Sequence, residues 1–332
     1  MTNDNSQMPK RIGFTTSFPV EVVFAAGHIP IDLNNIFIIG DPQINVENAE
    51  FAGYPRNVCS WIKGMYDVVL SSNIDAVVGV VEGDCSNTHS MMSTFKDKEI
   101  EVIPFSFPLS RDKNKLKEEI HKLEKYFGVS HEEVIKVKKR LDKIREKLVL
   151  LDELTFKENK VSGAENHLWL VSSSDFNGNP DKFEMELDSF IREATEREPY
   201  NVDFKFAFLG VPPIISDLYD FLSENKVNVV FNEIQRQFAM PYLEDDIVEQ
   251  YFRYTYPYSV FDRLDDIKPE LEKRKIDAVI SYSQSFCHRQ IDNIIIKKHI
   301  NLPLLTIEGD QPGDLDARTK LRIESFLDML KY

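Results

Sequence analysis

The sequence Ile74-Asp-Ala-Val77 returns as Ile276-Asp-Ala-Val279, and each copy reaches a cysteine at the same interval, Cys85 in the first and Cys287 in the second. The apolar runs that link the tetrapeptides to these cysteines are typical of parallel strands buried on both faces of a sheet. An aspartate before a buried strand is common in α/β proteins, so the tetrapeptide alone could be coincidence. The shared interval favours a structural repeat. Each cysteine is therefore predicted just beyond the carboxyl end of a strand, at the sheet edge where such proteins bind ligands.

The same order of elements surrounds both copies. We expect a strand, a helix and a second strand before each copy, and an extended segment with a proline after it. The expected elements are residues 11–16, 18–26, 29–33 and 103–105 in the first half, and 204–209, 212–224, 227–231 and 302–304 in the second. The helix of the second half is predicted to begin at Pro212, because proline is well tolerated at the first helical position. This order predicts an α/β protein with two doubly wound, Rossmann-like lobes of similar plan.

A stretch of different character separates the two lobes. From Leu116 to Leu151 apolar residues recur at the spacing of amphipathic helices, and Gly128 separates two such helices. Ser130 and Glu133 form a capping box that opens the second helix. We interpret the stretch as a solvated helical connector, with docking of a partner as the alternative. The predicted domains are a first lobe at 1–110 with Cys59 and Cys85, a helical connector region at 111–200, and a second lobe at 201–332 with Cys287.

Composition and charge limit the classes of function. The 332 residues are 42% hydrophobic, which is enough for a sizeable core in two domains. The formal net charge of −15 argues against binding to nucleic acid or to an anionic membrane, because both need clustered Lys and Arg. No apolar run approaches the roughly 20 residues of a membrane span, and no leader peptide is recognised. Three cysteines make a poor disulfide framework. We expect a cytoplasmic protein that binds small molecules and proteins.

Familiar catalytic and nucleotide-binding signatures are missing from the sequence. There is no G-x-G-x-x-G after a strand, no P-loop, no H-E-x-x-H and no G-x-S-x-G. Neither a nucleotide held on a glycine-rich turn nor hydrolysis by a serine or zinc enzyme is therefore indicated.

The remaining chemistry lies in the cysteines. Cys59 follows a proline-containing segment and is predicted near a helix start, and Asp84 is predicted to cap the helix that follows Cys85. A helix amino terminus lowers a thiol pKa and so favours the thiolate that metals bind. One such cysteine would more often be an inert buried residue. If the lobes face each other across their carboxyl edges, however, Cys59, Cys85 and Cys287 can converge.

Two metal centres fit three converging thiolates. A cubane iron–sulfur cluster held by three cysteines keeps one iron free of protein sulfur, and that iron can bind substrate. Alternatively, His89, four residues after Cys85, can complete a tetrahedral Cys₃His zinc site, although the C-x₂-C spacing of structural zinc sites is absent.

The order of these segments resembles the 2-hydroxyacyl-CoA dehydratase and benzoyl-CoA reductase family, most closely a dehydratase D-component subunit. The segments that carry the resemblance are Tyr54-Pro-Arg-Asn-Val-Cys59-Ser, Glu82-Gly-Asp-Cys85, Phe286-Cys287, Leu302-Pro-Leu-Leu-Thr-Ile-Glu-Gly-Asp310 and Arg322-Ile-Glu-Ser-Phe326-Leu. The resemblance covers most of the chain. It implies a [4Fe-4S] cluster on Cys59, Cys85 and Cys287, located between the two lobes.

The resemblance also implies a reaction and its partners. A separate ATP-hydrolysing iron–sulfur activator would supply a low-potential electron, which passes through the cluster to an acyl-CoA thioester or another acceptor. The related double-cubane cluster proteins, which reduce small molecules as homodimers at an [8Fe-9S] centre, are an alternative, and so is a paralogous partner subunit. A different class of function, a non-catalytic zinc-binding or metabolite-binding protein, also stays open.

Candidate proton donors follow the predicted strands. Thr15, Thr16 and Ser17 follow the first strand, Asp84 adjoins Cys85, and His288 adjoins Cys287. Each can donate a proton near the cluster. Ordinary turn, cap and surface roles are the alternative for each of them.

Overall fold

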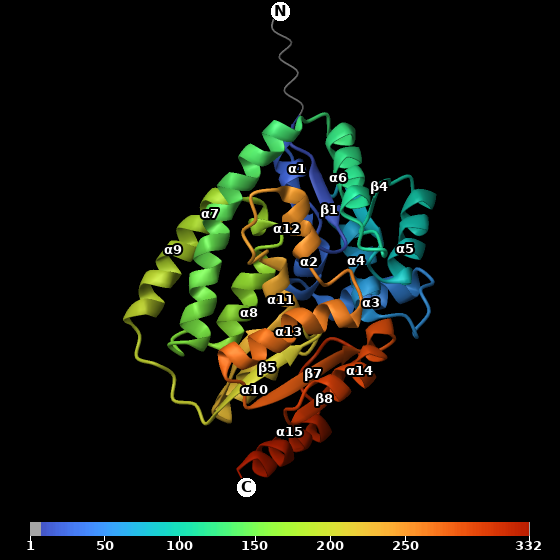
Figure 1. Ribbon diagram of the computed structural model, residues 1–332. Helices are drawn as coiled ribbons and strands as arrows, with labels where there is room; N and C mark the ends of the chain where they lie inside the picture. Colours follow the sequence, from blue (N-terminus) through green and yellow to red (C-terminus); the bar gives the residue numbers. More distant parts are fainter. Residues whose placement is uncertain (1–7, 332) are drawn as a thin grey trace, which may run out of the picture.

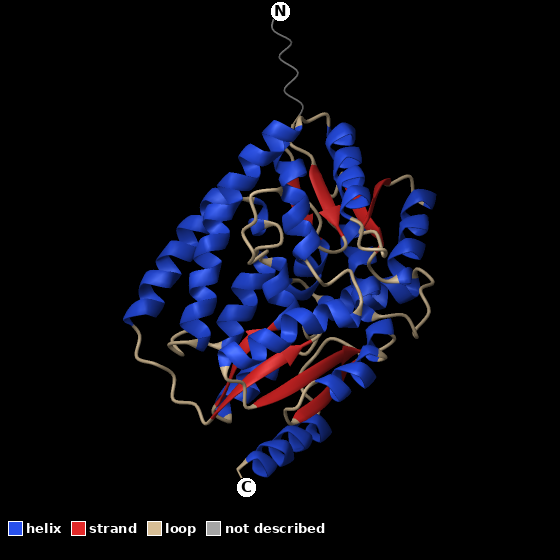
Figure 2. Ribbon diagram, in the orientation of Figure 1, coloured by secondary structure: helices blue, strands red, loops and turns tan. Residues whose placement is uncertain are grey.

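The computed structural model describes residues 8–331, and within them it forms two parallel β-sheets of four strands each. The strand orders, β2-β1-β3-β4 and β6-β5-β7-β8, are the same in topology. The strands are β1 (Arg11–Phe14), β2 (Ile29–Asp32), β3 (Ala76–Glu82), β4 (Glu101–Ser106), β5 (Phe204–Leu209), β6 (Val227–Asn232), β7 (Ala278–Gln284) and β8 (Leu304–Gly309). Figure 1 shows the first sheet in the upper part of the molecule and the second in the lower part, and Figure 2 shows both enclosed by helices. The prediction of two Rossmann-like lobes is confirmed.

The repeated tetrapeptide begins the equivalent strand in each sheet. β3 lies between β1 and β4, and β7 lies between β5 and β8. Asp75 accepts a hydrogen bond of 2.7 Å from the backbone N–H of Arg11, and Asp277 accepts one of 2.7 Å from Lys205. The backbone N–H groups of both aspartates donate back to the carbonyls of the same two residues at 2.9 Å. The aspartate thus fixes the register between neighbouring strands in both lobes, which explains its repetition.

Helices cover both faces of the first sheet. They are α1 (Val20–Ala25), α2 (Leu33–Ile39), α3 (Pro42–Phe51), α4 (Ser60–Ser71) and α5 (Ser86–Asp97). Ala76, Val78 and Val80 of β3 pack into one core cluster with α1, whereas Val77 packs into another with α2 to α5. This alternation follows from the two-residue period of a strand, whose successive side chains point to opposite faces.

The helical segment after β4 completes the core of the first lobe. Its helices are α6 (Lys113–Phe127), α7 (His131–Phe156), α8 (Gly163–Ser172) and α9 (Pro180–Glu196), with a short 3₁₀ turn, η1 (Phe176–Gly178). The predicted capping box of Ser130 and Glu133 is present at the start of α7. The apolar positions of α6 and α7, from Leu116 to Leu151, are buried in the same cluster as β1 and β3. The segment therefore covers a face of the first sheet, and its apolar stripe is not exposed to solvent.

The second sheet is covered in the same way. Its helices are α10 (Leu218–Glu224), α11 (Glu233–Phe238), α12 (Ile247–Arg253), α13 (Val260–Arg274), α14 (Asp292–His299) and α15 (Ala317–Leu330), with a second 3₁₀ turn, η2 (His288–Gln290). α10 and α15 pack on one face, and α13 and α14 pack on the other. Ile247 and Tyr251 of α12 instead join the core of the first lobe, so the two lobes share buried contacts.

The helix predicted over 212–224 begins later than expected, at Leu218. Pro213 explains the difference, because a proline disfavours helical backbone at the residue before it, here Pro212. Residues 211–213 form a loop that lines the cavity described below. Among residues 8–331, no helix is both long enough and apolar enough to cross a membrane.

Candidate functional site

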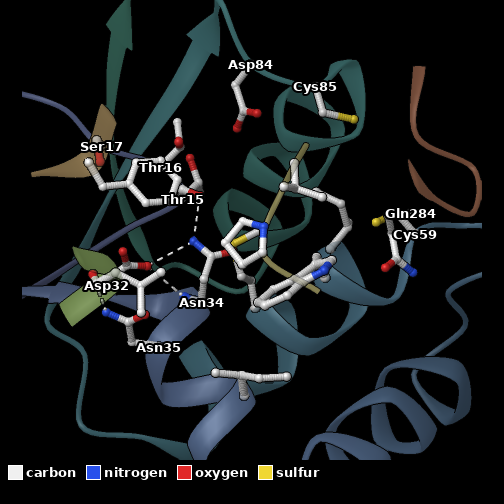
Figure 3. A pocket seen from close by; sticks show the side chains of 18 of the residues that line it. Thr15, Thr16, Ser17, Asp32, Asn34, Asn35, Cys59, Asp84, Cys85 and Gln284 are labelled. Atoms are coloured by element: carbon white, nitrogen blue, oxygen red, sulfur yellow. Dashed lines mark hydrogen bonds between the residues drawn. The ribbon is translucent and has the colours of Figure 1, made fainter. Parts of the chain in front are cut away.

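A cavity of about 120 Å³ lies between the lobes, at the carboxyl ends of strands from both sheets. From the first lobe it is lined by residues that follow β1, β2 and β3, and from the second by residues that follow β5 and β7. Cys59, Cys85 and Cys287 all line this one cavity. Figure 3 shows Cys59 and Cys85 on one side of it, and Thr15, Ser17 and Asp32 on the other. The sheet edges predicted to bind ligands therefore face each other.

Each of the three cysteines is the residue immediately before a helix. Cys59 precedes α4, Cys85 precedes α5 and Cys287 precedes η2. The sulfur of Cys85 accepts a hydrogen bond of 3.3 Å from the backbone N–H of Asn87, two residues on. The backbone N–H groups at the same offset from the other two cysteines, those of Trp61 and Arg289, act to lower the thiol pKa there. The fold thus directs at least one backbone N–H dipole at each sulfur.

Burial opposes these dipoles and keeps the thiols protonated. It raises the pKa of Cys59 to about 12, with smaller contributions from the charges of Cys287 and Cys85. Burial also raises the pKa of Cys85 and of Cys287. The three thiols line one cavity, and burial disfavours their ionisation. Binding of a metal would release their protons, because metals bind the thiolate form of cysteine.

The described side chains do not form a site for a single metal ion. Among residues 8–331, no three His, Cys, Asp or Glu side chains lie close enough to share one metal ion. His89, the proposed fourth zinc ligand, is exposed on α5 and does not line the cavity. The arrangement therefore does not support the Cys₃His site. In a cubane each cysteine binds a different iron, so its ligands need not converge on one point.

The turn that presents Cys85 depends on Gly83. Gly83 has a φ of +91°, and a Cβ atom there would lie 2.8 Å from the Cβ atoms of both Phe107 and Pro257. Gly128 also has a positive φ, +68°, but a Cβ atom there would meet nothing within 4 Å.

Replacing Gly83 by alanine is therefore expected to destabilise the protein by about 3 kcal/mol, because backbone strain and overpacking add. The control Gly128→Ala carries only the backbone strain and should cost about 1 kcal/mol. Anaerobic guanidinium unfolding measures both variants. Equal losses would contradict a packing role for Gly83.

Several of the predicted proton donors line the cavity, and two of its polar atoms are unpaired. Thr15, Thr16, Ser17 and Asp84 are all in its wall. Thr15 Oγ1 already accepts the backbone N–H of Val80 at 3.2 Å. Nε1 of Trp61, a wall residue, is buried without a hydrogen-bond partner among the described residues. Ser17 Oγ makes no hydrogen bond there within normal distance either, although it lies near enough to the buried Tyr254 hydroxyl to act on the pKa of that tyrosine. Buried polar atoms without partners are uncommon, so these two mark places where a ligand can bind.

Asp84 and His288 are placed differently from one another. The predicted cap role of Asp84 is wrong, since Cys85 is the capping residue and Asp84 instead accepts the Thr88 hydroxyl at 2.9 Å. Burial raises the pKa of Asp84 to about 6, so a minority of these carboxyl groups is protonated at neutral pH and can donate a proton. His288 is exposed at the start of η2 and does not line the cavity. Partial shielding of its ring from solvent and the nearby Arg289 lower its pKa.

The sequence reasoning missed several polar groups of the cavity wall, among them Asp32 and His167. Burial raises the pKa of Asp32, and burial together with Asp32 raises the pKa of its neighbour Asp175 to about 7. Burial lowers the pKa of His167 to about 4. Asp32 ends β2, so the argument that picked out residues after β1 and β3 applies to it as well. His167 lies on α8, and no sequence signal connects that helix with the cavity.

Comparison with known proteins agrees with the resemblance seen in the sequence. A search of curated proteins found no match. The family model described as 2-hydroxyglutaryl-CoA dehydratase, D-component, matches residues 15–330, which is nearly the whole chain and includes all three cysteines. This chain therefore belongs to the 2-hydroxyglutaryl-CoA dehydratase D-component family.

Proposed function

We propose that this chain is the iron–sulfur subunit of a redox enzyme and that Cys59, Cys85 and Cys287 hold a [4Fe-4S] cluster with one iron free of protein sulfur. The observation that carries the proposal is the meeting of three free cysteines, drawn from both lobes, at one cavity. Each stands at a helix start with a backbone N–H acting on its sulfur. Hydrogen bonds to cluster sulfurs and thiolates are among the features that set the reduction potential of such centres.

The proposed partner is an ATP-dependent iron–sulfur activator, and the proposed assembly is a homodimer or a pair with a paralogous subunit. When bound, the cluster supplies one-electron transfer at low potential. In a dehydration the substrate returns the electron after losing water, so one electron serves many turnovers. In a reduction every electron that enters the product must come from the activator, and a proton accompanies it. Counting electrons per product therefore distinguishes the two reactions.

The protein's own residues would bind and protonate the substrate. Ser17 and Trp61 offer the unpaired polar atoms of the wall. Asp84 has the raised pKa of a proton donor.

A second candidate is a reductase of small molecules at a double-cubane centre in a homodimer. One observation favours it over an acyl-CoA dehydratase, because no Lys or Arg lines the cavity among the described residues. The phosphates of coenzyme A are ordinarily bound by such cations.

Anaerobic purification followed by iron, sulfide and zinc analysis tests the proposal. We expect about four irons and about four sulfides per chain, a brown colour, and an EPR signal after reduction. One zinc per chain without sulfide would contradict it. A protein that binds the iron but takes no electron from any ATP-dependent activator would contradict the redox role alone.

A further inference from the structure

A buried ion pair anchors a chain of hydrogen bonds that leads to the cavity. Asp152 of α7 accepts a hydrogen bond of 2.9 Å from Arg274 of α13. Burial acts to raise the pKa of Asp152, but Arg274 outweighs it and holds that pKa below its usual value. Asp152 is therefore a carboxylate and can only accept hydrogen bonds. The side-chain amide of Asn166, 3.1 Å from it, must present its NH₂ group to Asp152.

That orientation fixes every group that follows in the chain. Because the NH₂ group of Asn166 donates to Asp152, its Oδ1 atom is left as the acceptor. This atom accepts a hydrogen bond of 2.9 Å from the NH₂ group of Asn232. Asn232 Oδ1 then accepts from the hydroxyl of Tyr219 at 2.7 Å. Tyr219 has only one hydroxyl proton, so it must be the acceptor towards His167 Nδ1, which lies 3.3 Å away. His167 therefore carries its proton on Nδ1.

The consequence is a free lone pair at the cavity. Burial keeps the imidazole of His167 neutral, with a pKa of about 4, so Nε2 has no proton. Nδ1 is held by Tyr219, and no protein group among residues 8–331 donates to Nε2. Because His167 lines the cavity, Nε2 is the ring nitrogen left to accept a hydrogen bond from a ligand.

The charges around the cavity restrict the ligand further. The wall contains the carboxyl groups of Asp32 and Asp84 and, among the described residues, neither Lys nor Arg. The nearest cation, Arg289, lies behind the wall: its guanidinium donates to the backbone carbonyl of Tyr256, stacks 4.4 Å from the ring centre of that tyrosine and lies 3.7 Å from Asp292. Its charge acts to lower the pKa of Asp84 and of Cys287, but it does not line the cavity. An anionic ligand would therefore have to leave water without direct contact to a cation, beside two carboxyl groups, which is costly in a buried site.

We propose that the cavity binds a small substrate without negative charge, and that this substrate donates an N–H or O–H group to Nε2 of His167. The proposal rests on the proposed function, since it takes the cavity beside the three cysteines as the active site. It adds a specificity residue, His167, and a charge selection that excludes carboxylates and phosphates.

Lactamide and lactate are a matched pair of probes for this proposal. They have nearly the same size and shape, both carry a hydroxyl group, and only lactate is anionic at neutral pH. Calorimetric titration of the anaerobically purified protein should show lactamide binding at least tenfold tighter than lactate. His167→Phe, which keeps a ring but removes the lone pair, should weaken lactamide binding at least tenfold. Tyr219→Phe, which removes only the group that holds Nδ1, should weaken it less.

The control is His89→Gln, an exposed position on α5 outside the cavity, which should bind lactamide as the unmodified protein does. The proposal would be overturned if lactate bound as tightly as lactamide. It would also be overturned if the His167→Phe variant bound lactamide with unchanged affinity. Iron and sulfide are measured on the same samples. Selective lactamide binding by a protein without a cluster would leave this inference standing and refute the proposed redox function.

Discussion

Replacing Cys287 by serine is expected to remove most of the iron from the purified protein and to abolish turnover that depends on the activator. Cys287 is the only one of the three cysteines that comes from the second lobe. Under the proposed function, its loss would remove a cluster ligand and also the connection that the cluster would make between the lobes. Because metal binding is coupled to folding, the lobes should also move apart more readily. Iron content, together with hydrogen exchange of the residues around the cavity, measures both effects.

The neighbouring variant His288→Ala is the matched control. His288 is exposed and outside the cavity, so its loss should leave the iron content unchanged and at most slow turnover. Full iron and full activity in Cys287→Ser would mean that Cys287 is only a buried apolar residue. In that case the proposal of a three-cysteine cluster would fail.

The repeat in the sequence predicted the two sheets because its signal is local. Asp75 and Asp277 each bond to the backbone of the neighbouring strand, so the same residue recurs wherever that junction recurs. The interval from the tetrapeptide to the cysteine is the same in both copies, and from it Cys85 and Cys287 were predicted beyond equivalent strands. Their meeting with Cys59 at one cavity depended only on the carboxyl edges of the two sheets facing each other.

Other features depend on contacts that no local pattern records. His167 reaches the cavity because α8 packs against β6 and places its residues beside Tyr219 and Asn232, far along the chain. The apolar stripe of α6 and α7 predicted helices correctly, but their amphipathic spacing does not say what they cover. Here they cover the first sheet. A connector and a core helix have the same sequence period.

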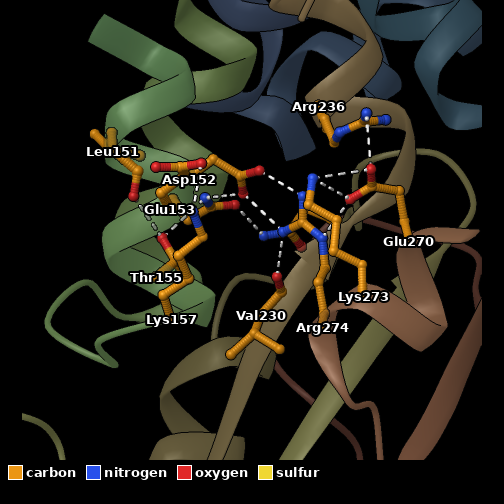
Figure 4. Close-up of polar contacts among 12 residues, drawn as sticks. Leu151, Asp152, Glu153, Thr155, Lys157, Val230, Arg236, Glu270, Lys273 and Arg274 are labelled. Atoms are coloured by element: carbon orange, nitrogen blue, oxygen red, sulfur yellow. Dashed lines mark hydrogen bonds and ion pairs between the residues drawn. The ribbon is translucent and has the colours of Figure 1, made fainter.

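The connection between the lobes also rests on Arg274, whose side chain is 1% exposed. It donates to Asp152 of α7 at 2.9 Å, to Glu270 at 2.8 Å and to the carbonyl of Val230 at 2.6 Å. Figure 4 shows the side chain of Arg274, which belongs to the same helix as Glu270, reaching toward Asp152 on α7. Its guanidinium also lies 4.5 Å from the ring centre of Phe156.

Arg274→Met is expected to lower the free energy of unfolding by about 3–5 kcal/mol, because it leaves the buried carboxylate of Asp152 without its cation. Lys273→Met, one residue earlier, is the control. Lys273 is 52% exposed and pairs with the same Glu270 at 3.2 Å, so its loss should cost less than about 1 kcal/mol. Anaerobic guanidinium unfolding measures both variants.

A double variant separates the two origins of this loss. If the cost of Arg274→Met is the unpaired charge, then adding Asp152→Asn should recover part of the stability, because an amide is cheaper to bury than a carboxylate. If the cost is lost packing against Phe156, the second change should bring no recovery. The amide introduced at position 152 can also donate a hydrogen bond, so Asn166 would no longer be held in one orientation. Recovered stability together with weaker lactamide binding would therefore show that the ion pair between the lobes also sets the hydrogen-bonding state of His167.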